Sequence, residues 1–195
     1  MPVKQRRGEE TKQRLLDGAL AAHESSDFTV QAVLAKSGVS LGSLYHHFGS
    51  FDGLAAALYA RCMAELLDGI VAVLERARTA RTGVYAVVTG YLSFVTEQPA
   101  KARFIHASAY AAYLPAHADM IEEAKRPRVA RVAAWLAPHV AAGSIVDLPD
   151  PFTEMLLIGP VAEISRRWLS GAPVDLAKAA KVLPARTWAA LRASD

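Results

Sequence analysis

Five residues that follow the glycine turn at Gly38 have types and spacing suited to contact with a nucleic acid. They are Leu41, Gly42, Ser43, Tyr45 and His46, and they form the outward face of a short predicted helix. Small residues let a helix approach a DNA duplex closely, and hydroxyl or imidazole groups can hydrogen-bond to phosphates and base edges. The chemistry predicted for this face is therefore non-covalent recognition of DNA.

Two short helices must position this face. The first spans 30–37 with Thr29 as its N-cap, and it stops at Gly38, where a left-handed backbone ends helices readily. The second spans 40–47 and is capped by Ser40. Such a pair is typical of the helix-turn-helix, although enzymes and helical bundles use similar turns. Three apolar residues are expected to pack the pair together: Val33, Val39 and Leu44.

The rest of the chain is also predicted to be helical. Of its residues 52% are hydrophobic, alanine is the commonest, and no long alternation of β-branched residues competes with helix. Apolar residues recur every fourth position from Leu54 to Leu74, which predicts one long helix from Ser50 to about Arg78. Pro127 and Pro160 are expected to kink or split their helices. The other predicted helices span 11–22, 82–98, 100–114, 118–142, 152–169 and 175–191.

These elements predict an all-α fold of about nine helices in two domains. Residues 1–50 form a three-helix domain with the helix-turn-helix, and residues 51–195 form a larger helical bundle. Cys62 is the single cysteine and lies in an apolar helical pattern, which is typical of a buried thiol in a reducing compartment. No apolar stretch reaches the ~20 residues of a membrane span, and the N-terminus resembles neither a secretory signal nor a transit peptide. We therefore expect a cytoplasmic protein without a membrane partner.

Positive charge is concentrated near the N-terminus. The whole chain has a formal charge of +3 and a pI near 9.1, which is too mild to identify a nucleic-acid binder. The N-terminal cluster has two interpretations: a solvated tail, or an arm that follows the phosphate backbone of DNA. Its cations are Lys4, Arg6, Arg7, Lys12 and Arg14, interrupted by Glu9 and Glu10.

A longer run around the glycine turn resembles a known family. The run comprises Gly38-Val39-Ser40, then Gly42-Ser43-Leu44-Tyr45-His46-His47-Phe48, then Ser50 and Leu54, behind the opening helix. Over roughly residues 11–58 it is similar to the tetracycline-repressor (TetR) family of bacterial transcription regulators. The resemblance implies a homodimer that binds a palindromic operator through its N-terminal domains, and a C-terminal helical domain that dimerises and holds a small inducer.

The resemblance also implies roles for individual residues. By position, Thr29 and Tyr45 contact phosphates, and Phe48 belongs to the core. Leu41 and Phe51 stand where the family often has basic residues, so the arm of Lys4, Arg6 and Arg7 is a candidate to compensate. The predicted DNA-binding set is Thr29, Gln31, Ser40, Leu41, Gly42, Ser43, Tyr45 and His46, together with these three cations.

The expected mechanism is that of a repressor released by a small effector. The long helix from Ser50 starts beside the recognition element and continues into the larger domain, so a tilt of this helix can couple effector and DNA. A mainly apolar or aromatic effector is expected near Met63, Leu66, Phe104 and Tyr110. Two late apolar helices, 118–142 and 152–169, exceed what one small bundle can cover and independently favour a homodimer.

Two other function classes stay open. A small helical enzyme is the first, but the sequence lacks the common catalytic and nucleotide-binding fingerprints. A protein-interaction module that has lost DNA binding is the second, because Leu41 and Phe51 replace cations. We expect no cofactor and no metal, since the adjacent His46 and His47 face different directions on a helix and the other histidines have no ligand spacing.

Overall fold

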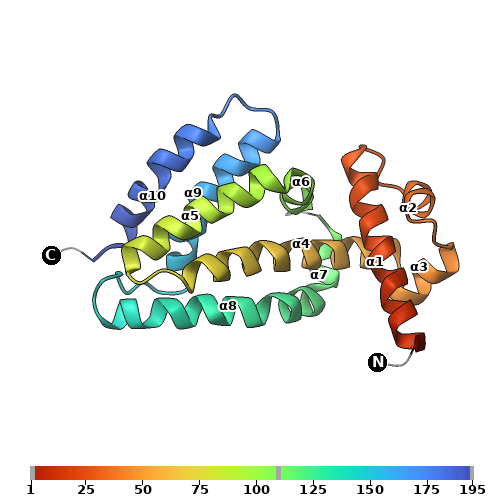
Figure 1. Ribbon diagram of the computed structural model, residues 1–195, viewed down its shortest axis with the longest axis horizontal. Coiled ribbons are helices and arrows are strands. Elements are labelled where there is room, and N and C mark those ends of the chain that lie inside the picture. The colour runs from red at the N-terminus through yellow and green to blue at the C-terminus, as the bar shows by residue number, and fades with distance from the viewer. Residues whose placement is uncertain (1–2, 109–110, 194–195) are drawn as a thin grey trace. The chain divides into compact units, whose positions relative to one another are not determined.

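The computed structural model describes the backbone of residues 3–108 and 111–193, and the side chains of these ranges from residue 6 onward (Figure 1). No strand occurs among these residues, and the predicted all-α fold is confirmed. None of the described helices is both long and apolar enough to cross a membrane. The helices are α1 Val3–Glu24, α2 Val30–Ser37, α3 Leu41–Phe48, α4 Phe51–Leu74, α5 Ala80–Glu97, α6 Pro99–Ser108, α7 Tyr113–Ala116, α8 Ala118–Ala141, α9 Phe152–Leu169 and α10 Leu176–Leu191.

Two compact units make up the chain. The first contains Met1–Met63 together with Phe104–Ala124, and the second contains Ala64–Arg103 together with Lys125–Asp195. Helices α4, α6 and α8 each contribute residues to both units. The functional boundary predicted at residue 50 separates α3 from α4, and it stays a prediction.

In the first unit, α1 packs along α2 through an apolar face. Leu15, Leu16 and Ala19 are buried there, as expected for an amphipathic helix. Gly18 lies so close to Ser37 that a Cβ built on the glycine would be 2.8 Å from the serine Cβ. Glycine is therefore required where the two helices meet.

The turn between α2 and α3 is built as the sequence predicts. The Thr29 hydroxyl accepts a hydrogen bond from the N–H of Ala32, with 3.2 Å between oxygen and nitrogen. The Ser40 hydroxyl accepts one from the N–H of Ser43 at the same distance. Gly38 ends α2 with a φ of 61°, in the left-handed region that favours glycine. Both caps and the glycine stop thus match the sequence-based expectation.

Buried apolar side chains and one arginine of α1 hold α2, the turn and α3 together. Val33 and Leu44 are fully buried, and Val39 is half-buried. The Arg14 guanidinium on α1 donates hydrogen bonds to the carbonyls of Ser37 and Gly38, over 2.8 and 3.2 Å. A cation at these carbonyls satisfies the C-terminal end of α2. Arg14 therefore holds the turn, which makes it a structural residue of the N-terminal basic cluster.

A small aromatic cluster completes the first unit. Phe104 is fully buried, and its ring centre lies 5.0 Å from His23 and 5.5 Å from Phe28 in edge-to-face arrangements. Phe28 also contacts Phe51, with 5.0 Å between ring centres. These four rings join the ends of α1, α4 and α6 within this unit.

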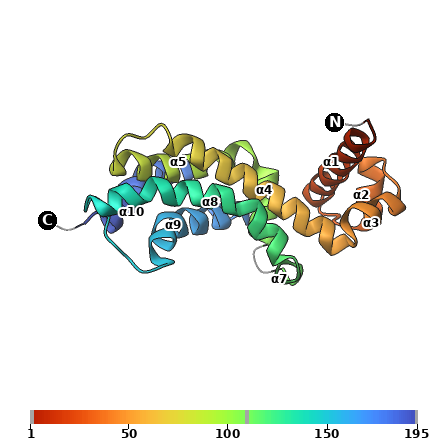
Figure 2. The same cartoon turned by 90° about the horizontal axis from the view of Figure 1, so that it is seen from below.

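In the second unit, α10 packs against α5 and α9, and α5 packs against α9. The second-unit part of α8 lies beside α4 in both ribbon views (Figures 1 and 2). Arg128 on α8 pairs with both carboxylate oxygens of Asp68 on α4, each over 2.8 Å. Arg131, also on α8, pairs with Glu75, the residue directly after the end of α4. Helix α8 also approaches α5 closely. A Cβ built on Gly83 of α5 would lie 2.0 Å from the ring of Trp135 on α8.

Helix α1 begins earlier than predicted, at Val3 instead of Thr11. The expected arm is therefore the first part of a helix. Contacts between residues four apart stabilise this extension: Arg6 pairs with Glu10 over 3.4 Å, and the Gln13 amide donates to Glu9 over 2.8 Å. Of the two acidic residues that interrupt the cationic cluster, Glu10 pairs with a cation of the cluster and Glu9 with a neighbouring amide.

The predicted helix 100–114 is divided into α6 and α7, which brings the total to ten helices among the described residues. Pro115 explains part of this break, because proline lacks an N–H and clashes with the carbonyl four residues before it. Earlier in the chain, α4 ends at Leu74, short of the predicted Arg78. Thr79 then caps α5.

Pro127 and Pro160 do not split their helices, contrary to one of the two expected outcomes. Helix α8 is continuous through Pro127 and also through Pro138, and α9 is continuous through Pro160. All three prolines are exposed, so water can solvate the carbonyls that lose an N–H partner.

Candidate nucleic-acid interface and ligand cavity

The outward face of α3 presents most of the residues predicted to contact DNA. Leu41 and Tyr45 are 46% and 48% exposed, and Gly42 and His46 are exposed as well. Ser43 is half-buried, and its hydroxyl lies 3.0 Å from that of Ser40. This face is capped at its N-terminal end and open to solvent over most of the helix.

The start of α2 adds two further predicted residues on the surface. Thr29 and Gln31 are exposed. The Thr29 hydroxyl donates to Asp27 over 3.1 Å while it accepts from the backbone of α2. A phosphate at this helix end would meet backbone N–H groups of the first turn, which favour anions.

The first turns of α1 lie beside the end of α3. A Cβ built on Gly8 would be 3.8 Å from the ring of His47, which places Arg6 and Arg7 next to the candidate face. Both arginines are exposed. The side chain of Lys4 is outside the described residues. The predicted arm and the predicted recognition helix are therefore parts of one surface in the first unit.

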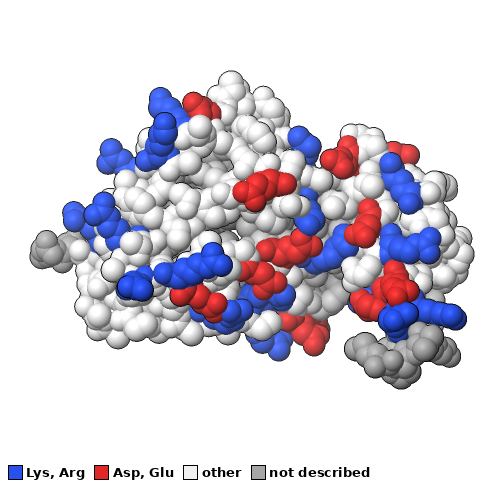
Figure 3. All heavy atoms as spheres, viewed as in Figure 1, with Lys and Arg blue, Asp and Glu red and all other residues white. Residues whose placement is uncertain are grey.

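Charge on this surface is mixed. Figure 3 shows Lys and Arg side chains interleaved with Asp and Glu around α1, without a large patch of one sign on this side. Helix α3 itself contains no Lys or Arg, and its last turn has His46 and His47. Phe48, predicted as core, is half-buried. Positive charge near this face thus comes mainly from α1 and from Lys36 in the last turn of α2.

A cavity of about 390 Å³ lies within the second unit. Aliphatic side chains of four helices form most of its wall, and Asp150, Thr153 and Glu154 supply its polar side chains. No aromatic residue and no methionine is among the lining residues of this cavity. The apolar lining residues are Leu67, Ile70, Val87, Val129, Val132, Ala133, Leu136, Pro151, Leu157 and Ile158.

None of the three described residues that were predicted to contact an effector, Met63, Leu66 and Phe104, lines this cavity. Phe104 belongs to the aromatic cluster of the first unit, and Met63 is assigned to that unit, whereas Leu66 is buried in the second unit. Tyr110 lies outside the described residues. The effector contact of these residues stays a prediction. A periodic signal for the wall of the cavity described here was present in α8, where Val129, Val132, Ala133 and Leu136 recur on one face.

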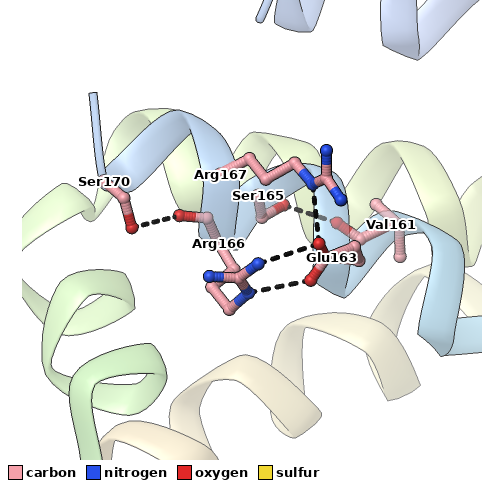
Figure 4. Close-up of polar contacts among 6 residues, drawn as sticks. All are labelled: Val161, Glu163, Ser165, Arg166, Arg167 and Ser170. Carbon is pink, nitrogen blue, oxygen red and sulfur yellow. Dashed lines mark hydrogen bonds and ion pairs between the residues drawn. The ribbon is translucent and has the colours of Figure 1, made fainter. Parts of the chain in front are cut away.

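Beyond the cavity, α9 carries an exposed ion-pair cluster (Figure 4). Glu163 accepts hydrogen bonds from Arg166 over 2.8 Å on each oxygen, and from Arg167 over 2.7 Å. The hydrogen bonds from Arg166 and then from Arg167 lower the pKa of Glu163 from 4.5 to about 2. In the described part of the chain, no group of three His, Cys, Asp or Glu side chains could hold a metal ion.

Comparison with solved structures identifies the architecture. A TetR family transcription regulator from Marinobacter aquaeolei VT8 matches with a TM-score of 0.77 at 17% identity, over 97% of this chain and 100% of that chain. A putative TetR family regulator from Shewanella sp. PV-4 matches with 0.75 at 20% identity, over 94% and 99%. FadR from Bacillus subtilis in complex with stearoyl-CoA matches with 0.74 at 15% identity, over 90% and 96%. This chain has the TetR fold.

The TetR fold thus rests on structure, since no protein-family model and no curated protein matches the sequence. It agrees with the resemblance noted around the glycine turn. In the TetR fold of this chain, the helix-turn-helix is complete with both caps, its glycine stop and its buried apolar contacts.

Proposed function

We propose that this chain is a transcriptional regulator, a repressor that binds a palindromic operator and is released by a small ligand. The observation that carries the proposal is the exposed face of α3, held on a fully capped helix-turn-helix in a TetR fold. The three solved structures compared above are described as transcription regulators. This supports a regulator in preference to an enzyme.

The DNA contacts proposed for this chain follow the exposed residues. Thr29 and Tyr45 contact phosphates, while Gln31, Leu41 and His46 lie near base edges or backbone. Ser40, Gly42 and Ser43 let α3 approach the major groove closely. Lys4, Arg6 and Arg7 add charge beside the groove and compensate for the absence of Lys and Arg in α3.

A homodimer is part of the proposal because a palindrome presents two equal half-sites. Three large apolar side chains at the start of α9 support it: Phe152, Met155 and Leu156 are 52%, 59% and 37% exposed. An exposed apolar group of this kind favours a protein interface, and a two-fold interface uses the same surface on both copies. The two copies of α3 would then lie about 34–36 Å apart, in successive major grooves.

Release by a ligand would act through α4. This helix begins at Phe51, shortly after the end of α3, and is continuous to the cavity wall at Leu67 and Ile70. A ligand that prefers one tilt of α4 changes the separation of the recognition helices. Coupling of about 1–3 kcal/mol gives roughly 5- to 150-fold, and ligand and DNA must weaken each other equally. The FadR complex with stearoyl-CoA supports a small-molecule site in this fold.

The decisive experiment is selection of bound duplexes from a random pool, followed by anisotropy titration of the recovered sequence. A regulator selects one palindrome and binds it more tightly than scrambled duplex. An interaction module that has lost DNA binding recovers no consensus and has no affinity for duplex at low salt. A ligand found by screening the complex is expected to lower operator affinity while the dimer stays intact; dissociation of the dimer by the ligand would contradict the tilt mechanism.

A further inference from the structure

The cavity in the second unit has an uneven distribution of charge. Two of its lining side chains are carboxylates, Asp150 and Glu154, and Thr153 adds a hydroxyl. No Lys, Arg or His is among the residues that line it. Every ionisable group that this cavity offers is therefore negative at neutral pH.

The carboxylates and the apolar wall occupy different depths. Asp150 and Glu154 are exposed, which places them at the rim. Ile70, Val87 and Leu157 are at most 3% exposed and form the inner wall. A molecule that fills the cavity therefore meets hydrocarbon inside and negative charge at the opening.

We propose that this cavity binds a cationic amphiphile. The hydrocarbon body of the ligand packs against the aliphatic wall, and its ammonium head lies at the rim between Asp150 and Glu154. The volume of about 390 Å³ lies within the usual range for small-molecule sites. The inference rests on the proposed function only for the consequence of binding, since this ligand would be the effector.

Other ligand classes fit the lining less well. A carboxylate, sulfate or phosphate head would meet two like charges without a cation to pair with it. A sugar or other polyol would bury hydroxyl groups against an aliphatic wall that cannot pair with them. A flat aromatic ligand would find no aromatic partner among the lining residues. Charge complementarity therefore selects the cationic head.

Three probes with one chain length test the head group. Decyltrimethylammonium, decanol and decanoate are titrated into the full-length protein by calorimetry, below the micelle-forming concentrations of the two ions and below the solubility limit of decanol. We expect the cation to bind at least tenfold more tightly than decanoate, with decanol between them. Equal affinity for cation and anion, tighter binding of decanoate, or binding of none of the three would overturn the proposal.

Variants locate the site and control for general electrostatics. Asp150→Asn with Glu154→Gln is expected to reduce the preference for the cation to less than threefold. The matched control is Asp147→Asn with Glu97→Gln, two exposed carboxylates that do not line the cavity, and it should keep the full preference. Ala133→Trp fills the cavity and should abolish binding of all three probes. Thermal unfolding of each variant confirms that the fold is retained.

Failure of this proposal can be told apart from failure of the proposed function. Duplex selection does not depend on the ligand, so a protein that selects a palindrome but prefers decanoate remains a regulator with another effector class. A protein that binds the cation at the rim carboxylates but selects no duplex keeps the cavity assignment and loses the regulatory one. Persistence of the cation preference in the Asp150→Asn/Glu154→Gln variant would overturn the assignment of the head to this rim.

Discussion

Tyr45 is the residue on α3 best placed to contact a phosphate, because its phenol hydroxyl can donate a hydrogen bond. It is half exposed, and Leu44 beside it anchors the helix in the core. A hydrogen bond to a charged group contributes about 1.5–3 kcal/mol, so we expect Tyr45→Ala and Tyr45→Phe each to weaken operator binding about tenfold or more. Because the phenol is neutral, the dependence of affinity on salt should stay the same. Anisotropy titrations at several salt concentrations measure both quantities, and an unchanged affinity in Tyr45→Phe would remove the hydroxyl from the interface.

Gly18 gives a prediction about stability. Its substitution by alanine would force a Cβ to within 2.8 Å of Ser37, so α1 and α2 must separate. We expect Gly18→Ala to lower the free energy of unfolding by about 1–3 kcal/mol. Gly42→Ala is the matched control, because nothing lies within 4 Å of its added Cβ and alanine favours helix by up to about 1 kcal/mol. Urea denaturation of both variants checks the contrast, and equal stabilities would refute the close approach.

Glu163 gives a prediction about pH. Its pKa is lowered from 4.5 to about 2 by Arg166 and Arg167, so the folded protein favours the charged carboxylate more than the unfolded chain does. Its contribution to stability is present above about pH 4.5 and is lost as the pH falls toward 2. We expect Glu163→Gln to melt below the wild type at pH 6, with a difference that shrinks steadily as the pH falls through this range. Melting curves measured by circular dichroism test it, and a constant difference would contradict the shift.

At the scale of helices, α1 begins before Arg6 and Arg7, and this determines how the two side chains could reach DNA phosphates. Arg6 and Arg7 belong to a helix whose Gly8 lies beside α3, so in the proposed complex they would meet DNA as part of this helix. Each phosphate contact that a cation makes changes the slope of log affinity against log salt by about 0.9. We therefore expect Arg6→Gln with Arg7→Gln to lower this slope by about 0.9 to 1.8. Lys181→Gln with Arg186→Gln, on α10, removes the same charge far along the chain and should leave the slope unchanged.

The helices also show what the sequence can and cannot reveal. Both caps and Gly38 act within a few residues, so α2 begins and ends at the predicted residues, and α9 does as well. The start of α1 depended on the pairs that Glu9 and Glu10 form with neighbours four residues away, which propensity alone did not reveal. The cavity wall was missed because its residues come from four separate segments. Only folding brings these residues together, and the buried side chains of Leu66 and Phe104 are not among them.

At the scale of the whole molecule, the exposed apolar start of α9 predicts association. We expect light scattering at micromolar concentration to give twice the chain mass of 20.9 kDa. Phe152→Glu with Met155→Glu should shift the mass toward the monomer, because two charges would be buried without partners. Met120→Glu, an exposed apolar residue on α8, is the control and should leave the mass unchanged. A wild-type protein that is monomeric at this concentration would exclude the two-fold arrangement on a palindrome.

The indole of Trp135 packs against Gly83 with its ring centre 4.4 Å from that of His139, on the same helix as the cavity residues Val132, Ala133 and Leu136. We therefore expect its ultraviolet emission to depend on the polarity of the surroundings of α8 beside the cavity. Filling the cavity should change the spectrum without any attached dye. The fluorescence of Trp135 should therefore report whether a ligand fills the cavity. Comparison with Trp135→Phe would separate this fluorescence from that of Trp168 and Trp188.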